Sequence, residues 1–135
     1  MLFLKSEVDN FYWPVHEKGT YFSEINELVQ GTGNELLVVL VPDKYGVYYP
    51  LLSEKNVAPL EAQSRWNYLE KELVRQGIQV VNLRAPLRAQ AAEGLQKREY
   101  NYAKDDTHWN RSGIGTAAAE ILRTWNSSSG LAPRR

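Results

Sequence analysis

Asp106 and His108 are separated by a single residue in the stretch 104–110, which reads KDDTHWN. In an extended segment, residues two apart point to the same side, so both side chains can face one pocket. A carboxylate beside a histidine holds the ring in one tautomer and stabilises its protonated form, which suits a general base. The stretch holds no nucleophile, so it predicts only part of a hydrolytic or acyl-transfer site.

Two other interpretations of this stretch stay open. A metal site would use Asp105, Asp106 and His108 as ligands, although the chain has one other histidine, His16, and no cysteine. Alternatively, His108 only caps or packs against the start of the next helix. Asp105, three residues before the histidine, is a second carboxylate within reach of the ring.

The surrounding residues predict that the motif lies between a strand and a helix. A short strand is predicted over 99–102, and Asn110 is a favourable N-cap for the last helix. That helix carries an apolar stripe at helical spacing, formed by Ile114, Ala117, Ala118, Ile121, Leu122 and Trp125. Strand-to-helix junctions are where α/β folds place their chemistry.

Two apolar runs, 36–41 and 78–83, predict the centre of a sheet. The first is uninterrupted, which is typical of a strand buried on both faces. A helix predicted over 60–76 joins the two runs, so they should be parallel with a right-handed crossover. Further helices are predicted over 20–30 and from Pro86 to about residue 98.

These elements predict an α/β fold, a three-layer sandwich with a short, mostly parallel sheet of the flavodoxin-like kind. We expect one domain over residues 1–126 and a polar tail over 127–135.

The loop after the first strand leaves its carboxyl end, where open α/β sheets bind ligands. Asp43, Lys44 and Tyr45 are therefore second-rank candidates for lining the site, the alternative being a solvated turn with a local ion pair. The aromatic residues that follow are predicted to continue as a loop.

The composition excludes several classes of protein. Lys plus Arg and Asp plus Glu both number 16, which argues against a dedicated binder of nucleic acid or anionic membranes. The chain has no cysteine, so it forms no disulfide and no thiolate zinc site. No stretch is long and apolar enough to cross a membrane, and the first residues lack the pattern of a signal peptide.

Several sequence blocks occur in a characteristic order: LFLKSE at 2–7, LVVLVPDK at 37–44, Trp66 and Leu69 in a helix, VVNL at 80–83, and YAKDDTHWN at 102–110 with Gly113. This order resembles the SGNH-hydrolase-like domain of the alginate O-acetyltransferases AlgJ and AlgX. The resemblance covers the chain from residue 2 to about 125.

The resemblance implies an extracytoplasmic, periplasmic protein that acts on acetyl esters of exopolysaccharides, without a metal or cofactor. Asp106 and His108 match two members of a Ser-His-Asp triad, so the resemblance favours Asp106 over Asp105. It gives Trp109 a packing role beside the site. In this family the nucleophilic serine follows later, in a Gly-Asp-Ser block.

This sequence contains no Gly-Asp-Ser block. None of its serines lies in a predicted strand-turn-helix elbow; they are Ser6, Ser23, Ser53, Ser64, Ser112, Ser127, Ser128 and Ser129. We therefore expect the first part of such a domain, in which the Asp-His pair without its serine loses most of its catalytic advantage.

Two further hypotheses belong to other classes. The chain is a non-catalytic module that binds carbohydrate or another protein, with Trp13, Tyr45, Tyr48 and Tyr49 as stacking residues. Alternatively it self-associates as a homo-oligomer, because part of a domain leaves a sheet edge and apolar surface uncovered.

Overall fold

A computed structural model describes residues 2–10, 19–52 and 60–128 of the chain. In chain order the elements are α1 (Lys5–Asn10), α2 (Gly19–Gly31), β1 (Leu37–Leu40), α3 (Lys44–Tyr48), the 3-10 helix η1 (Tyr49–Leu51), α4 (Leu60–Arg75), β2 (Gln79–Asn82), α5 (Arg84–Leu95) and α6 (Arg111–Ser128). Trp13, His16 and the tail from residue 129 lie outside the described residues, so the structure does not test the predictions made for them.

The two apolar runs pair as predicted. β1 and β2 are parallel, with Val38 opposite Val80 and Leu40 opposite Asn82. α4 connects them, which makes the predicted strand-helix-strand unit. Within the described residues the sheet consists of these two strands. Because so few strands are present, most β1 side chains are only half-buried although both faces of the strand are covered.

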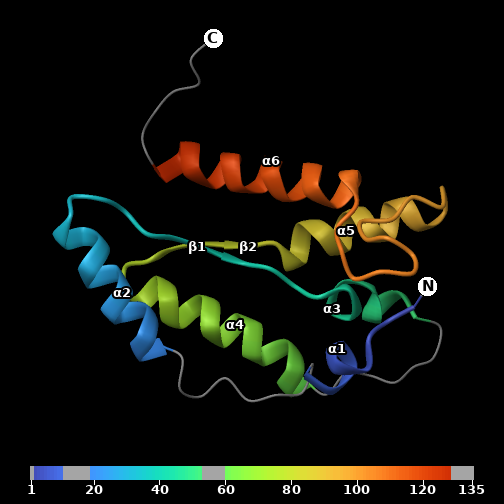
Figure 1. The fold of residues 1–135 in the computed structure, drawn as a ribbon, viewed down its shortest axis with the longest axis horizontal. Helices are drawn as coiled ribbons and strands as arrows, with labels where there is room; N and C mark the ends of the chain where they lie inside the picture. The colour runs from blue at the N-terminus through green and yellow to red at the C-terminus, as the bar shows by residue number, and fades with distance from the viewer. Residues whose placement is uncertain (1, 11–18, 53–59, 129–135) are drawn as a thin grey trace, which may run out of the picture.

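α2 and α4 cover one face of the sheet (Figure 1). Leu40, Leu73 and Ile78 are buried on this side. The partly buried side chains that surround them are Phe22, Leu36, Val38, Trp66, Leu69 and Val80. The helical spacing of Trp66, Leu69 and Leu73 in the sequence therefore marks the buried side of α4, as predicted.

α6 runs along the other face of the sheet, and α3 and α5 lie beyond the carboxyl ends of the two strands (Figure 1). The buried cluster on this side is the larger of the two, and it comprises Val47, Tyr48, Val81, Leu83, Leu87, Ala91, Tyr102 and Ala117. The sheet thus lies between two helical layers, and the predicted three-layer α/β class with a short parallel sheet is confirmed.

Two local predictions were wrong. The segment after β1 is α3 followed by η1, and it is not a loop, because its aromatic side chains are buried against the core and Asp43 caps its first turn. The segment 99–102 is not a strand. Only Tyr102 forms a bridge, antiparallel to Trp109, since no neighbouring strand is present on that side within the described residues.

The apolar stripe of α6 is only partly buried. Ala117 is buried and Ile121 packs against the same cluster, whereas Ile114, Leu122 and Trp125 are 55%, 59% and 42% exposed. The stripe is wider than the surface that α5 and β2 offer to it.

None of the helices in the described part of the chain has both the length and the hydropathy of a membrane span.

Candidate functional site

The Asp-Thr-His motif lies at the tip of a hairpin formed by residues 101–110. The loop of this hairpin, residues 103–108, is called the site loop below. Its two ends are joined by backbone hydrogen bonds. Ala103 N donates to His108 O at 3.0 Å, and Asn110 N donates to Asn101 O at 3.0 Å. The motif therefore precedes α6 as predicted, but a bridge rather than a strand leads into it.

Asp106 and His108 form a hydrogen-bonded pair, called the Asp-His pair below. His108 Nδ1 donates to Asp106 Oδ1 over 2.7 Å, and the same oxygen accepts the backbone N–H of Thr107 at 2.5 Å. The side chain of His108 is 84% exposed and that of Asp106 is 51% exposed. Contact through Nδ1 leaves Nε2 on the exposed side of the ring, where a general base needs it.

The hydrogen bond from His108 is the main cause that lowers the pKa of Asp106 below its ordinary value of 3.8; partial burial opposes this, and the N–H groups of Thr107 and His108 reinforce it. A carboxylate with a lowered folded-state pKa contributes stability above its unfolded pKa, and this contribution is lost as pH falls through the folded pKa. Asp106 therefore remains ionised across the neutral range and keeps its role as an acceptor for the ring.

This pKa shift gives a first prediction. In His108→Ala, the side chain of Asp106 should titrate at higher pH than in the wild type, because the ring donor is gone. Carboxyl carbon chemical shifts followed by NMR from pH 7 to pH 2 measure this. Glu120 serves as the control, since its pKa is lowered by Arg123 on α6 and should not change. Equal Asp106 midpoints in both proteins would contradict the hydrogen bond.

Lys44 was predicted either to line the site or to lie in a solvated turn, and the solvated turn is wrong. Its side chain is completely buried under the site loop. Nζ donates to the carbonyl oxygens of Ala103, Lys104 and Asp106 at 2.6, 3.0 and 2.9 Å. Burial lowers the pKa of Lys44, and the nearby carboxylate of Glu7 is the main group that opposes this effect.

The other second-rank candidates hold the framework of the site. Asp43 Oδ1 accepts the backbone N–H of Gly46 at 2.5 Å and so caps α3. The ring of Tyr45 lies between those of Phe3 and Tyr49, with both centroid distances 5.4 Å. These contacts fix α3 and the N-terminal segment next to the site loop.

The remaining two candidates lie in the site loop or directly after it. Trp109 meets the ring of Tyr102 edge-on, with the ring centroids 6.3 Å apart. Asp105 is exposed at the loop tip, and the carboxylate that contacts the ring is Asp106.

The sequence did not reveal Asn101 as a site-supporting residue. Its side chain is buried, and Nδ2 donates to Leu87 O in α5 at 2.6 Å. Its backbone N–H donates to the hydroxyl oxygen of Tyr48 at 2.7 Å. A lone asparagine after a charged segment carries no pattern that predicts burial, so no sequence signal could have found it.

The predicted N-cap of α6 is confirmed. Asn110 Oδ1 accepts the backbone N–H groups of Ser112 and Gly113 at 2.9 and 3.1 Å. The side-chain amide of Asn110 also donates to Tyr100 O, so one residue both starts the helix and closes the hairpin. The cap thereby fixes the distance between the Asp-His pair and α6.

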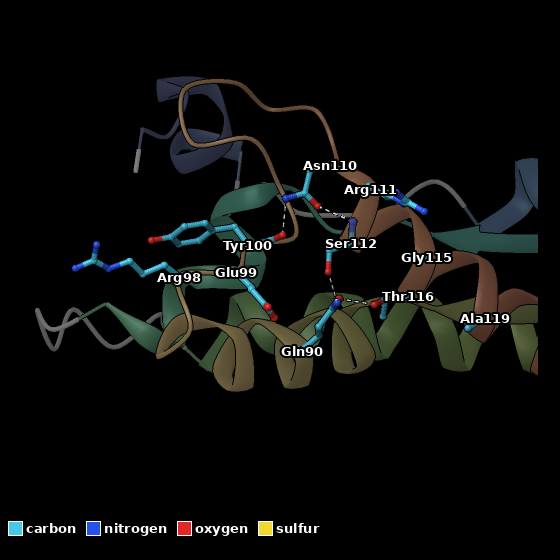
Figure 2. Close-up of a pocket in the computed structure, with 10 residues that line it drawn as sticks. All are labelled: Gln90, Arg98, Glu99, Tyr100, Asn110, Arg111, Ser112, Gly115, Thr116 and Ala119. Carbon is cyan, nitrogen blue, oxygen red and sulfur yellow. Dashed lines mark hydrogen bonds between the residues drawn. The ribbon is translucent and has the colours of Figure 1, made fainter.

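An open cavity of about 930 Å³ lies between α5, the hairpin and α6 (Figure 2). Its lining includes Gln90, Tyr100, Asn110, Ser112 and Thr116, but neither member of the Asp-His pair. Figure 2 shows the Ser112 hydroxyl directed toward Gln90, whose Nε2 donates to it at 2.5 Å. Ser112, the serine closest in sequence to the motif, is thus engaged with α5 and not with His108.

In the described ranges 2–10, 19–52 and 60–128, no group of three or more histidine, aspartate or glutamate side chains is arranged to hold a metal ion. Asp105, Asp106 and His108 do not form such a group. The contact that the geometry does provide is the two-residue hydrogen bond between a carboxylate and an imidazole.

The fold is that of an SGNH-hydrolase-like α/β domain. The chain matches the family described as the SGNH hydrolase-like domain of acetyltransferase AlgX over residues 2–134, and it belongs to this family. The resemblance expected from the sequence blocks is thereby confirmed. A comparison with curated protein sequences found no match.

Among solved structures, the chain is similar to the O-acetyltransferase domain of Pseudomonas putida AlgJ, with a TM-score of 0.68 and 19% sequence identity. The similarity covers 99% of this chain and 45% of that chain. The two share a fold, and this chain spans less than half of the length of the AlgJ domain.

Proposed function

We propose that this chain supplies the acid–base part of a serine-dependent site that transfers or hydrolyses acetyl esters on a polysaccharide outside the cytoplasm. The observation that carries the proposal is the 2.7 Å hydrogen bond from His108 Nδ1 to Asp106, with the opposite edge of the ring exposed. Membership of the AlgX acetyltransferase family supports the substrate class.

In this mechanism His108 Nε2 accepts the proton of a serine hydroxyl while the serine oxygen attacks the acetyl carbonyl carbon. Asp106 keeps the ring in the tautomer that presents Nε2 and stabilises the imidazolium that forms. The proton then passes from the ring to the departing sugar oxygen. The serine and the donors that hold the oxyanion come from a segment outside this sequence, which contains no Gly-Asp-Ser block.

The second candidate is a non-catalytic module that binds carbohydrate or a protein. The aromatic residues proposed for stacking give it little support. Tyr48 and Tyr49 are buried, and Tyr45 packs against Phe3 and Tyr49. A stacking platform needs an exposed ring face, and these three rings are used inside the fold.

The proposal is tested by the reactivity of His108 toward p-nitrophenyl acetate. In the isolated chain His108 Nε2 can accept a proton from a water molecule, whose oxygen attacks the acetyl carbon of this activated ester so that p-nitrophenolate leaves. We expect His108→Ala to lower the protein-catalysed rate by about tenfold or more, and Asp106→Ala to lower it to an intermediate value. Equal rates for the wild type and His108→Ala, both folded by circular dichroism, would contradict the proposal.

A fluorophosphonate probe, which labels activated serines, tests whether the nucleophilic serine lies within this chain. Intact-mass spectrometry of the isolated chain should show no adduct, since the serine is supplied from elsewhere. An adduct that forms in the wild type and disappears in His108→Ala would place an activated serine inside this chain. The acid–base role of His108 would then stand, and the origin of the serine would have to be revised.

A further inference from the structure

Lys44 places a positive charge directly beneath the site loop. It is the first residue of α3, and its side chain passes under the loop with no exposed surface. An ammonium group has three N–H donors and no acceptor. All three have a partner here, since Nζ lies 2.6 to 3.0 Å from the carbonyl oxygens of Ala103, Lys104 and Asp106.

Burying the Lys44 ammonium costs free energy unless each of its N–H donors has a partner. A buried charge is tolerated when hydrogen bonds and opposite charges replace water. The three carbonyls provide the hydrogen bonds, and the carboxylates of Glu7, Asp105 and Asp106 act on Lys44 as opposite charges. The ring of Phe3, with its centroid 5.9 Å from Nζ, closes a further side. The loop and the lysine therefore stabilise each other.

The shape of the site loop follows from these three contacts. Three carbonyl groups within four consecutive residues converge on one atom, so the backbone must curl around Nζ. Asp106 is held at both ends: its carbonyl oxygen accepts from Lys44, and its carboxylate accepts from His108. Fixing the peptide of Asp106 limits where its carboxylate can go, and hence which ring orientation of His108 is stabilised.

We propose that Lys44 is a positioning residue that holds the site loop in the conformation in which Asp106 accepts the hydrogen bond of His108. The catalytic meaning of this role rests on the proposed function, whereas the positioning itself does not. Lys44 acts through the backbone, because its ammonium contacts three carbonyl groups of the site loop and the Phe3 ring.

Lys44→Met tests the proposal, because methionine has a similar length and no N–H donor. The readout is the ring ¹⁵N spectrum of His108, which separates a ring protonated at Nδ1 from one protonated at Nε2, at a pH where the ring is neutral. His108→Ala assigns the signals, and Asp106→Ala gives the spectrum of an unsupported ring. We expect Lys44→Met to shift the His108 signals most of the way to those of Asp106→Ala.

Arg88→Met is the matched control. Arg88 is a partly buried cation that, like Lys44, donates to a carbonyl group, here Gly46 O, through Nε and Nη2 at 2.9 and 2.7 Å. It does not bond to the site loop, so its removal should cost stability but leave the His108 spectrum as in the wild type. A Lys44→Met protein that is folded and keeps the wild-type His108 spectrum would overturn the proposal.

Lys44→Gln keeps the proposal testable where the methionine variant does not fold. Its amide retains two N–H donors for the same carbonyls but no charge, and we expect a partial shift of the His108 signals. An unchanged spectrum in folded Lys44→Gln overturns the proposal in that case.

The p-nitrophenyl acetate rate, measured on the same samples, separates this inference from the proposed function. If the ring spectrum responds to Lys44 while the wild-type rate does not depend on His108, then positioning holds and the acetyl-transfer proposal fails.

Discussion

Gly113→Ala is expected to destabilise the domain by about 3 kcal/mol or more, while Gly115→Ala in the same helix is expected to stabilise it by about 0.5 to 1 kcal/mol. A Cβ on Gly113 would overlap the backbone carbonyl oxygen of Asn101, whereas a Cβ on Gly115 meets no atom within 4 Å. Urea unfolding of both variants, followed by circular dichroism, measures the difference in free energy.

The overlap at Gly113 cannot be relieved cheaply, because the oxygen belongs to the backbone. Asn101 O also accepts the N–H of Asn110, so moving it would break the hydrogen bond that closes the hairpin. Asn101 is further tied to Tyr48 and to Leu87 O. We expect a folded fraction of Gly113→Ala to show a disturbed His108 ring spectrum. If Gly113→Ala were as stable as Gly115→Ala, the close approach of α6 to the hairpin would be refuted.

Leu87→Ala is expected to cost about 2 to 5 kcal/mol of unfolding free energy, as is usual for a fully buried leucine. Leu87 has no exposed surface and lies in the cluster beneath the hairpin. Leu95, two turns further along α5, is 41% exposed, and its truncation should cost less than about 1 kcal/mol. Chemical denaturation of the two variants compares a buried and an exposed leucine on one helix.

Leu73→Ala separates the loss of packing from the effect on the site. Leu73 is also completely buried, but it lies in the cluster on the opposite face of the sheet. We expect a similar loss of stability, with no change in the His108 ring spectrum. Leu87→Ala should change that spectrum, because the loss of the side chain allows the backbone at residue 87 to shift. The Leu87 carbonyl oxygen accepts the hydrogen bond from Asn101 Nδ2, so such a shift reaches the hairpin. Equal His108 ring spectra for the two folded variants would show that the space left by the Leu87 side chain does not affect the site loop.

The periodic parts of the fold were predictable from the sequence. Continuous apolar runs gave the two parallel strands, and helical spacing gave α2, α4, α5 and α6 to within a few residues. The cap at Asn110 was also predictable, because a side-chain oxygen that accepts helix N–H groups acts within three residues of its own position. The order of the sequence blocks gave the family.

The tertiary structure alone decided what surrounds the Asp-His pair. A lysine after a proline and an aspartate is usually solvated, yet Lys44 is buried because a loop about 60 residues later supplies three carbonyl groups. The aromatic segment after it folds as α3 and η1 because a core is present to bury its rings. Asn101 finds its partners in α3 and α5, far away in the chain. Local patterns record contacts a few residues apart, whereas these contacts exist only after the layers have packed.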